Sequence, residues 1–131
     1  MFNIYSLLLY YSFSKFGRDA EYLVGLYLKS HDWNIYFSKG SRGPSDIIAI
    51  KNDIFWLIQI KSSTKIPKIH GYEIHDLIKL SKKLQNSFPV LAFIAPNMCC
   101  NINTNSIFFG DYLLNFYLLP EWKSITLSYY F

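Results

Sequence analysis

Residues 40–63 read GSRGPSDIIAIKNDIFWLIQIKSS, and they contain two apolar runs separated by a short polar turn. The first run covers residues 47–50 and the second covers residues 54–60, with Asn52 and Asp53 between them. Apolar runs of this length on either side of a tight polar turn are typical of two strands that pair with each other. The stretch therefore predicts a β-hairpin.

Polar side chains lie at the ends of these two runs. Asp46 precedes the first run, and Gln59 and Lys61 lie at the end of the second. Side chains alternate along a strand, so Gln59 and Lys61 share a face, and directly opposed residues of an antiparallel pair share that face too. A turn of two or four residues brings Asp46 opposite Gln59, whereas a turn of three brings it opposite Ile58. The favoured turns therefore predict that Asp46, Gln59 and Lys61 meet in one patch.

Helices are predicted on both sides of the hairpin in the sequence. Residues 17–31 and 72–86 have apolar residues three and four positions apart, which is typical of amphipathic helices. Glu21 lies at the edge of the first apolar stripe, where its carboxylate can face the sheet. The positions expected to face inward are Ala20, Leu23, Val24, Tyr27 and Leu28, followed in the second helix by Ile74, Leu77, Ile78, Leu80 or Ser81, and Leu84.

Further strands complete the predicted fold. Residues 33–37 read as a short strand, and the continuous apolar run at residues 89–95 is typical of a strand covered on both faces. The order α-β-β-β-α-β predicts an α/β fold with a mixed central sheet flanked by helices. Residues 1–14 are interpreted as an appended strand or short helix, and residues 107–131 as further strands or a short helix.

The composition favours a single domain over residues 1–131, long enough to bury a core. The chain is 51% hydrophobic and 19% aromatic, which favours a face for self-association. Its net charge of +4 favours a polyanionic partner. The adjacent Cys99 and Cys100 are interpreted as reduced, which suits a cytoplasmic protein. The apolar run at residues 7–11 is too short for a membrane span, which needs roughly 20 residues, and neither a signal peptide nor a membrane partner is expected.

The patch residues suit metal-dependent phosphodiester chemistry. Mg²⁺ takes oxygen ligands, normally one or two carboxylates together with water and substrate phosphate. Asp46 and Glu21 supply the charge, and Gln59 offers only a neutral amide oxygen. The ammonium of Lys61 can position the attacking water or stabilise the phosphate. Because Gln59 is neutral, the site has one negative charge less than a site with a carboxylate at this position, and we expect weaker metal binding.

Four stretches carry a resemblance to a known family. They are Gly17-Arg18-Asp19-Ala20-Glu21, the Ser38-Lys39-Gly40-Ser41-Arg42-Gly43 loop, Ser45-Asp46-Ile47-Ile48-Ala49-Ile50 and Gln59-Ile60-Lys61-Ser62. Over residues 17–95 the chain resembles the archaeal Holliday junction resolvases, within the restriction-endonuclease-like PD-(D/E)XK nucleases. The family's acids fall on Glu21, Asp46 and Gln59, and its lysine falls on Lys61. Mrr-like restriction enzymes also carry glutamine at the place of Gln59.

The resemblance implies a nuclease that cuts two strands of a four-way DNA junction symmetrically as a homodimer. It implies Mg²⁺, with Mn²⁺ as a substitute, as the cofactor and no small-molecule cofactor; the implied metal ligands are Glu21, Asp46, Gln59 and Ile60. Residues 96–131 are expected to supply the dimer interface. If a virus or mobile element encodes the protein, it would act in the host cytoplasm. The residues expected to contact DNA are Arg18, Ser38, Lys39, Ser41, Arg42, Lys65, Lys68, Lys82 and Lys83.

Other interpretations stay open at this point. Gln59 is compatible with a catalytically weak or inactive protein that binds DNA junctions on a nuclease scaffold. A restriction or repair nuclease that acts on other DNA is a further alternative. Glu73 or Asp76 could replace the missing carboxylate from the second helix. The lysines of that helix could equally form a solvated face.

Overall fold

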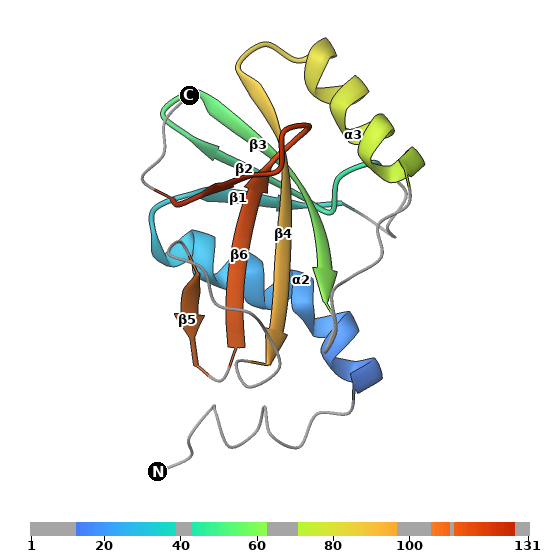
Figure 1. Cartoon of the computed structure of the whole chain (residues 1–131). Helices are drawn as coiled ribbons and strands as arrows, with labels where there is room; N and C mark the ends of the chain where they lie inside the picture. Colours follow the sequence, from blue (N-terminus) through green and yellow to red (C-terminus); the bar gives the residue numbers. More distant parts are fainter. Residues whose placement is uncertain (1–12, 39–42, 63–70, 97–105, 111, 128–131) are drawn as a thin grey trace.

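The computed structural model describes residues 13–38, 43–62, 71–96, 106–110 and 112–127. Within these ranges the chain forms one seven-stranded mixed sheet with a helix on each face (Figure 1). In chain order the elements are α2 (Phe13–Ser30), β1 (Asn34–Phe37), β2 (Ile47–Lys51), β3 (Ile54–Ser62), α3 (Gly71–Lys83), β4 (Ser87–Pro96), β5 (Ile107–Phe109), β6 (Tyr112–Leu118) and β7 (Lys123–Ile125). The strand order is β1-β2-β3-β4-β6-β5, and β7 also pairs with β6. The predicted fold class is confirmed.

The hairpin of β2 and β3 has the register that a two-residue turn predicts. Asn52 and Asp53 adopt φ angles of 51° and 65°, the conformation that a tight hairpin turn with the correct twist requires. Lys51 therefore pairs with Ile54, and the pairing continues to Ile47 beside Ile58. Counting one residue further back brings Asp46 to the level of Gln59.

β3 and β4 form the parallel pair of the sheet, and Gln59 lies beside Leu91 in it. Parallel neighbours need a long crossover connection, and the connection between these strands contains α3. Most of β4 is buried, with Val90, Leu91 and Ala92 almost inaccessible to solvent. The prediction of a central strand covered on both faces is confirmed.

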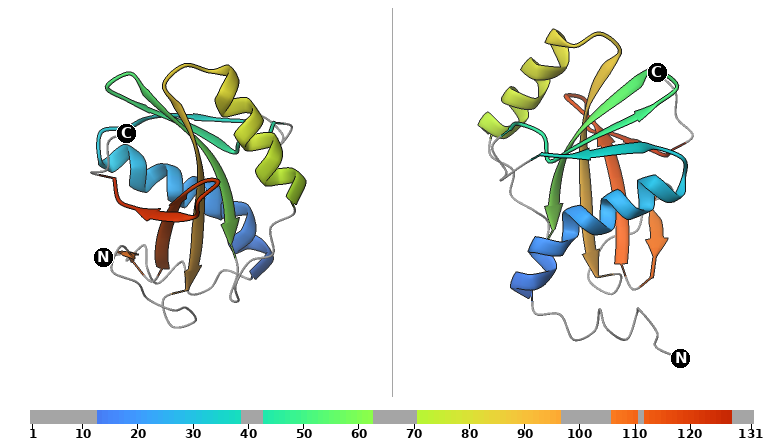
Figure 2. Two further views of the ribbon diagram at one scale, coloured as in Figure 1. Left: turned by 45° about the horizontal axis from the view of Figure 1, so that its top comes forward. Right: turned by 180° about the vertical axis from the view of Figure 1, so that it is seen from behind.

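The two helices lie on opposite faces of the sheet (Figure 2). Two layers of buried apolar side chains hold them there. The larger layer lies under α2, where Leu28 packs in the same cluster as Trp56 and Ile58 of β3. The smaller layer lies under α3, where Leu77 packs with Leu57 of β3. Because side chains alternate along β3, Gln59 and Lys61 follow Leu57 onto the α3 side of the sheet.

Gly25 sets how closely α2 approaches the edge of the sheet. A Cβ atom at this position would lie 2.7 Å from Cζ of Phe37 on β1, closer than such atoms approach in folded proteins. Glu21 lies one helical turn before Gly25 and so faces the same side of α2. The close approach at Gly25 therefore brings Glu21 near the start of β2.

Some predicted boundaries were wrong. α2 begins at Phe13, within the segment expected to be appended, because a helix tolerates an internal Gly17 at a cost of about 1 kcal/mol. α3 ends at Lys83, and Leu84, which was expected to face inward, is 44% exposed. The described part of the C-terminal region forms strands that join the same sheet. Residues 1–12, Cys99 and Cys100 lie outside the described residues. None of the described helices is long and apolar enough to cross a membrane.

Candidate functional site

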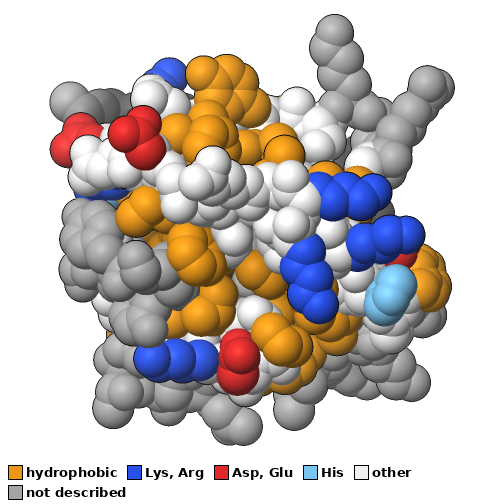
Figure 3. Space-filling view, turned by 90° about the horizontal axis from the view of Figure 1, so that it is seen from above, with side chains coloured by type: hydrophobic (Ala, Val, Ile, Leu, Met, Phe, Trp, Pro, Cys, Tyr) orange, Lys and Arg blue, Asp and Glu red, His pale blue; other side chains and the backbone are white. Residues whose placement is uncertain are grey.

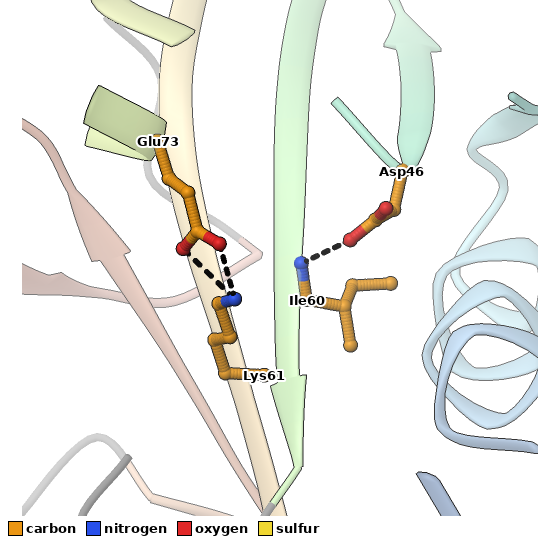
Figure 4. A network of polar contacts seen from close by, with 4 residues as sticks. All are labelled: Asp46, Ile60, Lys61 and Glu73. Atoms are coloured by element: carbon orange, nitrogen blue, oxygen red, sulfur yellow. Dashed lines mark hydrogen bonds and ion pairs between the residues drawn. The ribbon is translucent and has the colours of Figure 1, made fainter. Parts of the chain in front are cut away.

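Asp46 lies where β2 and β3 separate, and it is fixed by hydrogen bonds on both its backbone and its side chain. Its backbone N–H donates to the Ile58 carbonyl at 2.7 Å. Its Oδ2 accepts the backbone N–H of Ile60 at 2.8 Å (Figure 4). The carboxylate therefore takes the place of a strand partner for Ile60. With 7% exposure, Asp46 is a buried acid held by a contact across the hairpin.

The segment that precedes Asp46 is held against the end of β1. The Ser38 N–H donates to the Asp46 carbonyl at 3.0 Å. The Ser38 hydroxyl donates to the Ser45 carbonyl, and Ser45 itself is buried. Ser38 was predicted to contact DNA, and the structure gives it a supporting contact beneath the acid.

Glu21 of α2 meets Asp46 from the other side, and the two carboxyl groups affect each other. Burial raises the pKa of Glu21 above its usual range, and the charge of Asp46 raises this pKa further. A hydrogen bond between the two carboxyls also raises the pKa of Glu21 while it opposes the rise at Asp46. The two carboxyl groups therefore lie close enough for each to change the ionisation of the other.

Asp46 also has a raised pKa, and burial is its main cause. The Ile60 N–H bond and the Lys61 ammonium oppose this rise, because both favour the charged carboxylate. The charge of Glu73 adds to it. The net result is an acid that is harder to ionise than an exposed aspartate, in a position where a cation would relieve the cost.

Lys61 is paired with Glu73 from the first turn of α3. The Lys61 Nζ lies 3.0 Å from Glu73 Oε1 and 2.8 Å from Oε2 (Figure 4). The two side chains are 22% and 19% exposed, so the pair is largely shielded from water. The sequence placed Lys61 in the patch but did not predict this partner.

A cleft of about 710 Å³ contains most of these groups. It is lined by Glu21, Gly43, Pro44, Asp46, Gln59, Ile60, Tyr72, Glu73, Asp76, Lys79, Leu80 and Lys83. The predicted acids and Gln59 therefore share one cavity, between the start of β2, the end of β3 and the side of α3. Lys79 and Lys83 give the α3 wall a positive charge.

The lysines of α3 continue from the cleft onto the surface. Lys79, Lys82 and Lys83 are exposed, and Figure 3 shows Lys side chains together with a His on the side of the molecule that carries α3. Lys82 and Lys83 were predicted to contact DNA. Arg18 belongs to α2. The predicted contacts Lys39, Ser41, Arg42, Lys65 and Lys68 lie outside the described residues.

The donor set in the cleft fits a hard divalent cation. Glu21 and Asp46 offer two carboxylates that destabilise each other when both are charged, and Gln59 adds an amide oxygen. In the described parts of the chain, no three His, Cys, Asp or Glu side chains are grouped so as to hold a metal by themselves. A bound ion would therefore need water or phosphate oxygens to complete its shell, as Mg²⁺ commonly does.

Comparison with known proteins finds a likeness in fold. No protein-family model and no curated protein matches the sequence. The fold matches the solved structure of Hjc, a Holliday junction resolvase from the hyperthermophilic archaeon Archaeoglobus fulgidus, with a TM-score of 0.52 and 18% identity. The match covers 58% of this chain and 65% of that protein, which is less than two thirds of its length. Over the matched part, the mixed sheet with flanking helices is thus a fold that this chain shares with Hjc.

Proposed function

We propose that this protein is a divalent-metal-dependent endonuclease that cuts branched DNA, with four-way junctions as its substrate. The observation that carries the proposal is the Glu21–Asp46 carboxyl pair, which lies in a cleft with Gln59 and within electrostatic range of Lys61. The fold likeness to a Holliday junction resolvase supports the choice of substrate. The lysines of α3 that line the cleft would attract a polyanion such as DNA.

The two acids would hold Mg²⁺ or Mn²⁺, with Gln59 and Ile60 completing the protein's part of the shell. When bound, the ion would supply Lewis acidity and a water of lowered pKa. The protein's contribution is to fix the ligands. The Ile60 N–H holds one oxygen of Asp46, and a bound cation would favour the charged form of both carboxylates.

Lys61 would act on the phosphate or on the attacking water. An ammonium in a partly dry cleft stabilises the charge that develops on a phosphate as the bond to water forms. Glu73 holds the ammonium by both of its oxygens. The position of Lys61 is thus set before DNA arrives.

The exposed lysines of α3 would bind the DNA backbone beside the cleft. Lys79 and Lys83 line the cleft, and Lys82 lies next to them on the surface. Contacts of this kind are electrostatic and independent of sequence. They would position a strand so that one phosphate reaches Asp46.

A homodimer would bring two clefts to one junction. Large apolar side chains are exposed on α2 and β1, and Tyr22, Leu26, Tyr36 and Phe37 line a groove between these elements. β1 also ends the described strand order, and edge strands readily pair with another chain. These features favour the α2–β1 face as the contact with a second copy, in place of the C-terminal region expected from the sequence.

The test uses a labelled four-way junction and a linear duplex with the same sequence, each with Mg²⁺, Mn²⁺ or a chelator. Paired junction cuts that the chelator removes are expected from the wild type and are expected to disappear in Asp46→Asn. Asp53→Asn makes the same chemical change in the exposed hairpin turn and should cut normally. Cutting of the duplex at the same rate would reject the junction as the preferred substrate.

Gln59 favours one second candidate, a protein that binds junctions without cutting them. A neutral amide leaves the cleft with one carboxylate fewer, and this lowers its attraction for a cation. Tight junction binding with no cleavage under any metal would support this candidate. Recovery of cleavage in Gln59→Glu would then identify the missing charge as the cause.

A further inference from the structure

An ion pair joins Lys61 to Glu73, which lines the cleft. Both oxygens of Glu73 lie within 3.0 Å of the Lys61 ammonium, and Oε2 is shielded from solvent. The two groups come from different elements, β3 and α3, and are separated by 12 residues of sequence. The contact therefore depends on how α3 is placed over the sheet.

Gln59 lies beside this pair. It is two residues before Lys61 on the same side of β3, and it lines the same cleft as Glu73. A carboxylate at position 59 would place a negative charge close to both Asp46 and Lys61. Its amide provides none, and Glu73 is the acid that the structure places against Lys61 instead.

The charges of the cleft show what Glu73 changes. Among the charges that act on Asp46, Glu21 and Asp46 itself would be opposed by Lys61, which leaves one net negative charge to attract a divalent cation; Asp76, Lys79 and Lys83 also line the cleft and are the same in every case compared. Glu73 neutralises Lys61 and raises this to two, the value that a carboxylate at position 59 would give. Asp46 is sensitive to this charge, since Glu73 contributes to its raised pKa.

We propose that Glu73 is a positioning residue of the cleft, which holds Lys61 in place and supplies from α3 the negative charge that Gln59 lacks. The inference rests on the proposed function, because it assigns Glu73 a part in cation binding and cleavage. A purely structural ion pair is the competing explanation. It would affect the docking of α3 and leave the affinity for a cation unchanged.

The experiment compares Glu73→Gln, Gln59→Glu and the double variant with the wild type. Mn²⁺ affinity is measured by isothermal titration calorimetry, and junction cleavage is measured in parallel. Asp76→Asn is the matched control, because Asp76 lines the same cleft from the same helix, with 57% exposure and a contact to His75 rather than Lys61. Urea unfolding shows whether each variant is folded.

We expect Glu73→Gln to bind Mn²⁺ roughly tenfold more weakly, because one charge near a divalent ion is removed in a partly shielded site. The double variant should recover to within about threefold of the wild type, because the charge returns at position 59. Asp76→Asn should change the affinity by less than about twofold, because its charge is exposed and screened.

Three results would overturn the inference: an unchanged affinity in Glu73→Gln, an equal loss in Asp76→Asn, or no recovery in the double variant. Failure of the proposed function has a different signature. A wild type that binds Mn²⁺ but cuts no DNA rejects the nuclease and still tests Glu73 through the affinities. A wild type that binds no Mn²⁺ rejects both.

Discussion

Replacing Asp46 by alanine and by asparagine separates its structural role from its chemical role. Alanine removes both the charge and the hydrogen-bond acceptor for the buried Ile60 N–H. Asparagine removes the charge and keeps an oxygen in reach of the same N–H, which lies 2.8 Å from Oδ2 in the wild type. Both variants should lose junction cleavage, but they should differ in stability.

The size of that difference follows from the contact. A buried donor left without a partner costs about 1–3 kcal/mol, so Asp46→Ala should lower the free energy of unfolding by this amount. In Asp46→Asn a neutral bond replaces a charge-assisted one, a loss of about 1 kcal/mol. Burial disfavours the charge of Asp46, and removal of this charge offsets part of the loss. The asparagine variant should therefore be more stable than the alanine variant by about 1–2 kcal/mol.

The measurement is urea unfolding followed by circular dichroism, with the free energy extrapolated to water. Asp53→Asn, in the exposed turn, controls for the chemical change itself. Equal stability of the alanine and asparagine variants would refute the role of the carboxylate as a strand partner. Cleavage by Asp46→Asn at the wild-type rate would refute the need for its charge.

Four further predictions follow from the same structure. Folding raises the pKa of Asp46 and of Glu21, so the unfolded chain loses these two protons at a lower pH than the folded chain does. The free energy of unfolding should therefore fall as the pH rises from about 4 through the raised pKa values. The fall should be less steep in Asp46→Asn, which lacks one of the two groups. Urea unfolding across this pH range measures the slope. The double change Lys82→Ala and Lys83→Ala should weaken junction binding and reduce the slope of log K against log salt by about 2, measured by fluorescence anisotropy; an unchanged slope would mark these lysines as a solvated face. Leu77→Ala, in the buried layer under α3, should cost about 2–5 kcal/mol of unfolding free energy; a cost below this range would show that the layer closes around the gap. Tyr36→Asp, on the exposed groove beside β1, should shift the protein toward monomer in sedimentation velocity, and an unchanged dimer would place the contact elsewhere.

The hairpin could be predicted in detail because its information is local. Asn52 and Asp53 tolerate positive φ, so they specify a two-residue turn, and the turn fixes the register of every residue back to Ile47. Helical periodicity in the same way placed Glu21 on the side of α2 that faces the sheet. These two local rules gave the register of Asp46 and the face of Glu21, and the close packing of α2 at Gly25 then brings the two acids together.

Other features depend on contacts that are distant in the sequence. The Lys61–Glu73 pair requires α3 to lie over the end of β3, and neither helical periodicity nor strand alternation gives that placement. Leu84 follows the inward-facing pattern of α3, but Asn86 has a φ of 58° and the chain reverses there into β4. The Ser87 hydroxyl donates to the carbonyls of Ser81 and Leu84 at the helix end. The turn therefore overrides the apolar pattern.

Asp46 has both a structural role, as the acceptor for the Ile60 N–H, and a proposed chemical role in the cleft. These two roles affect how the sequences of related proteins would diverge. A lineage that no longer needed the activity proposed above could change Gln59 or Glu21 with little effect on its fold. Loss of Asp46 to an apolar residue would leave the Ile60 N–H without a partner at the point where β2 and β3 separate. Selection for folding alone would therefore retain Asp46 after selection for activity had ended. In alignments of such proteins, Asp46 should therefore vary less than Gln59 and Glu21 when the proposed activity is absent.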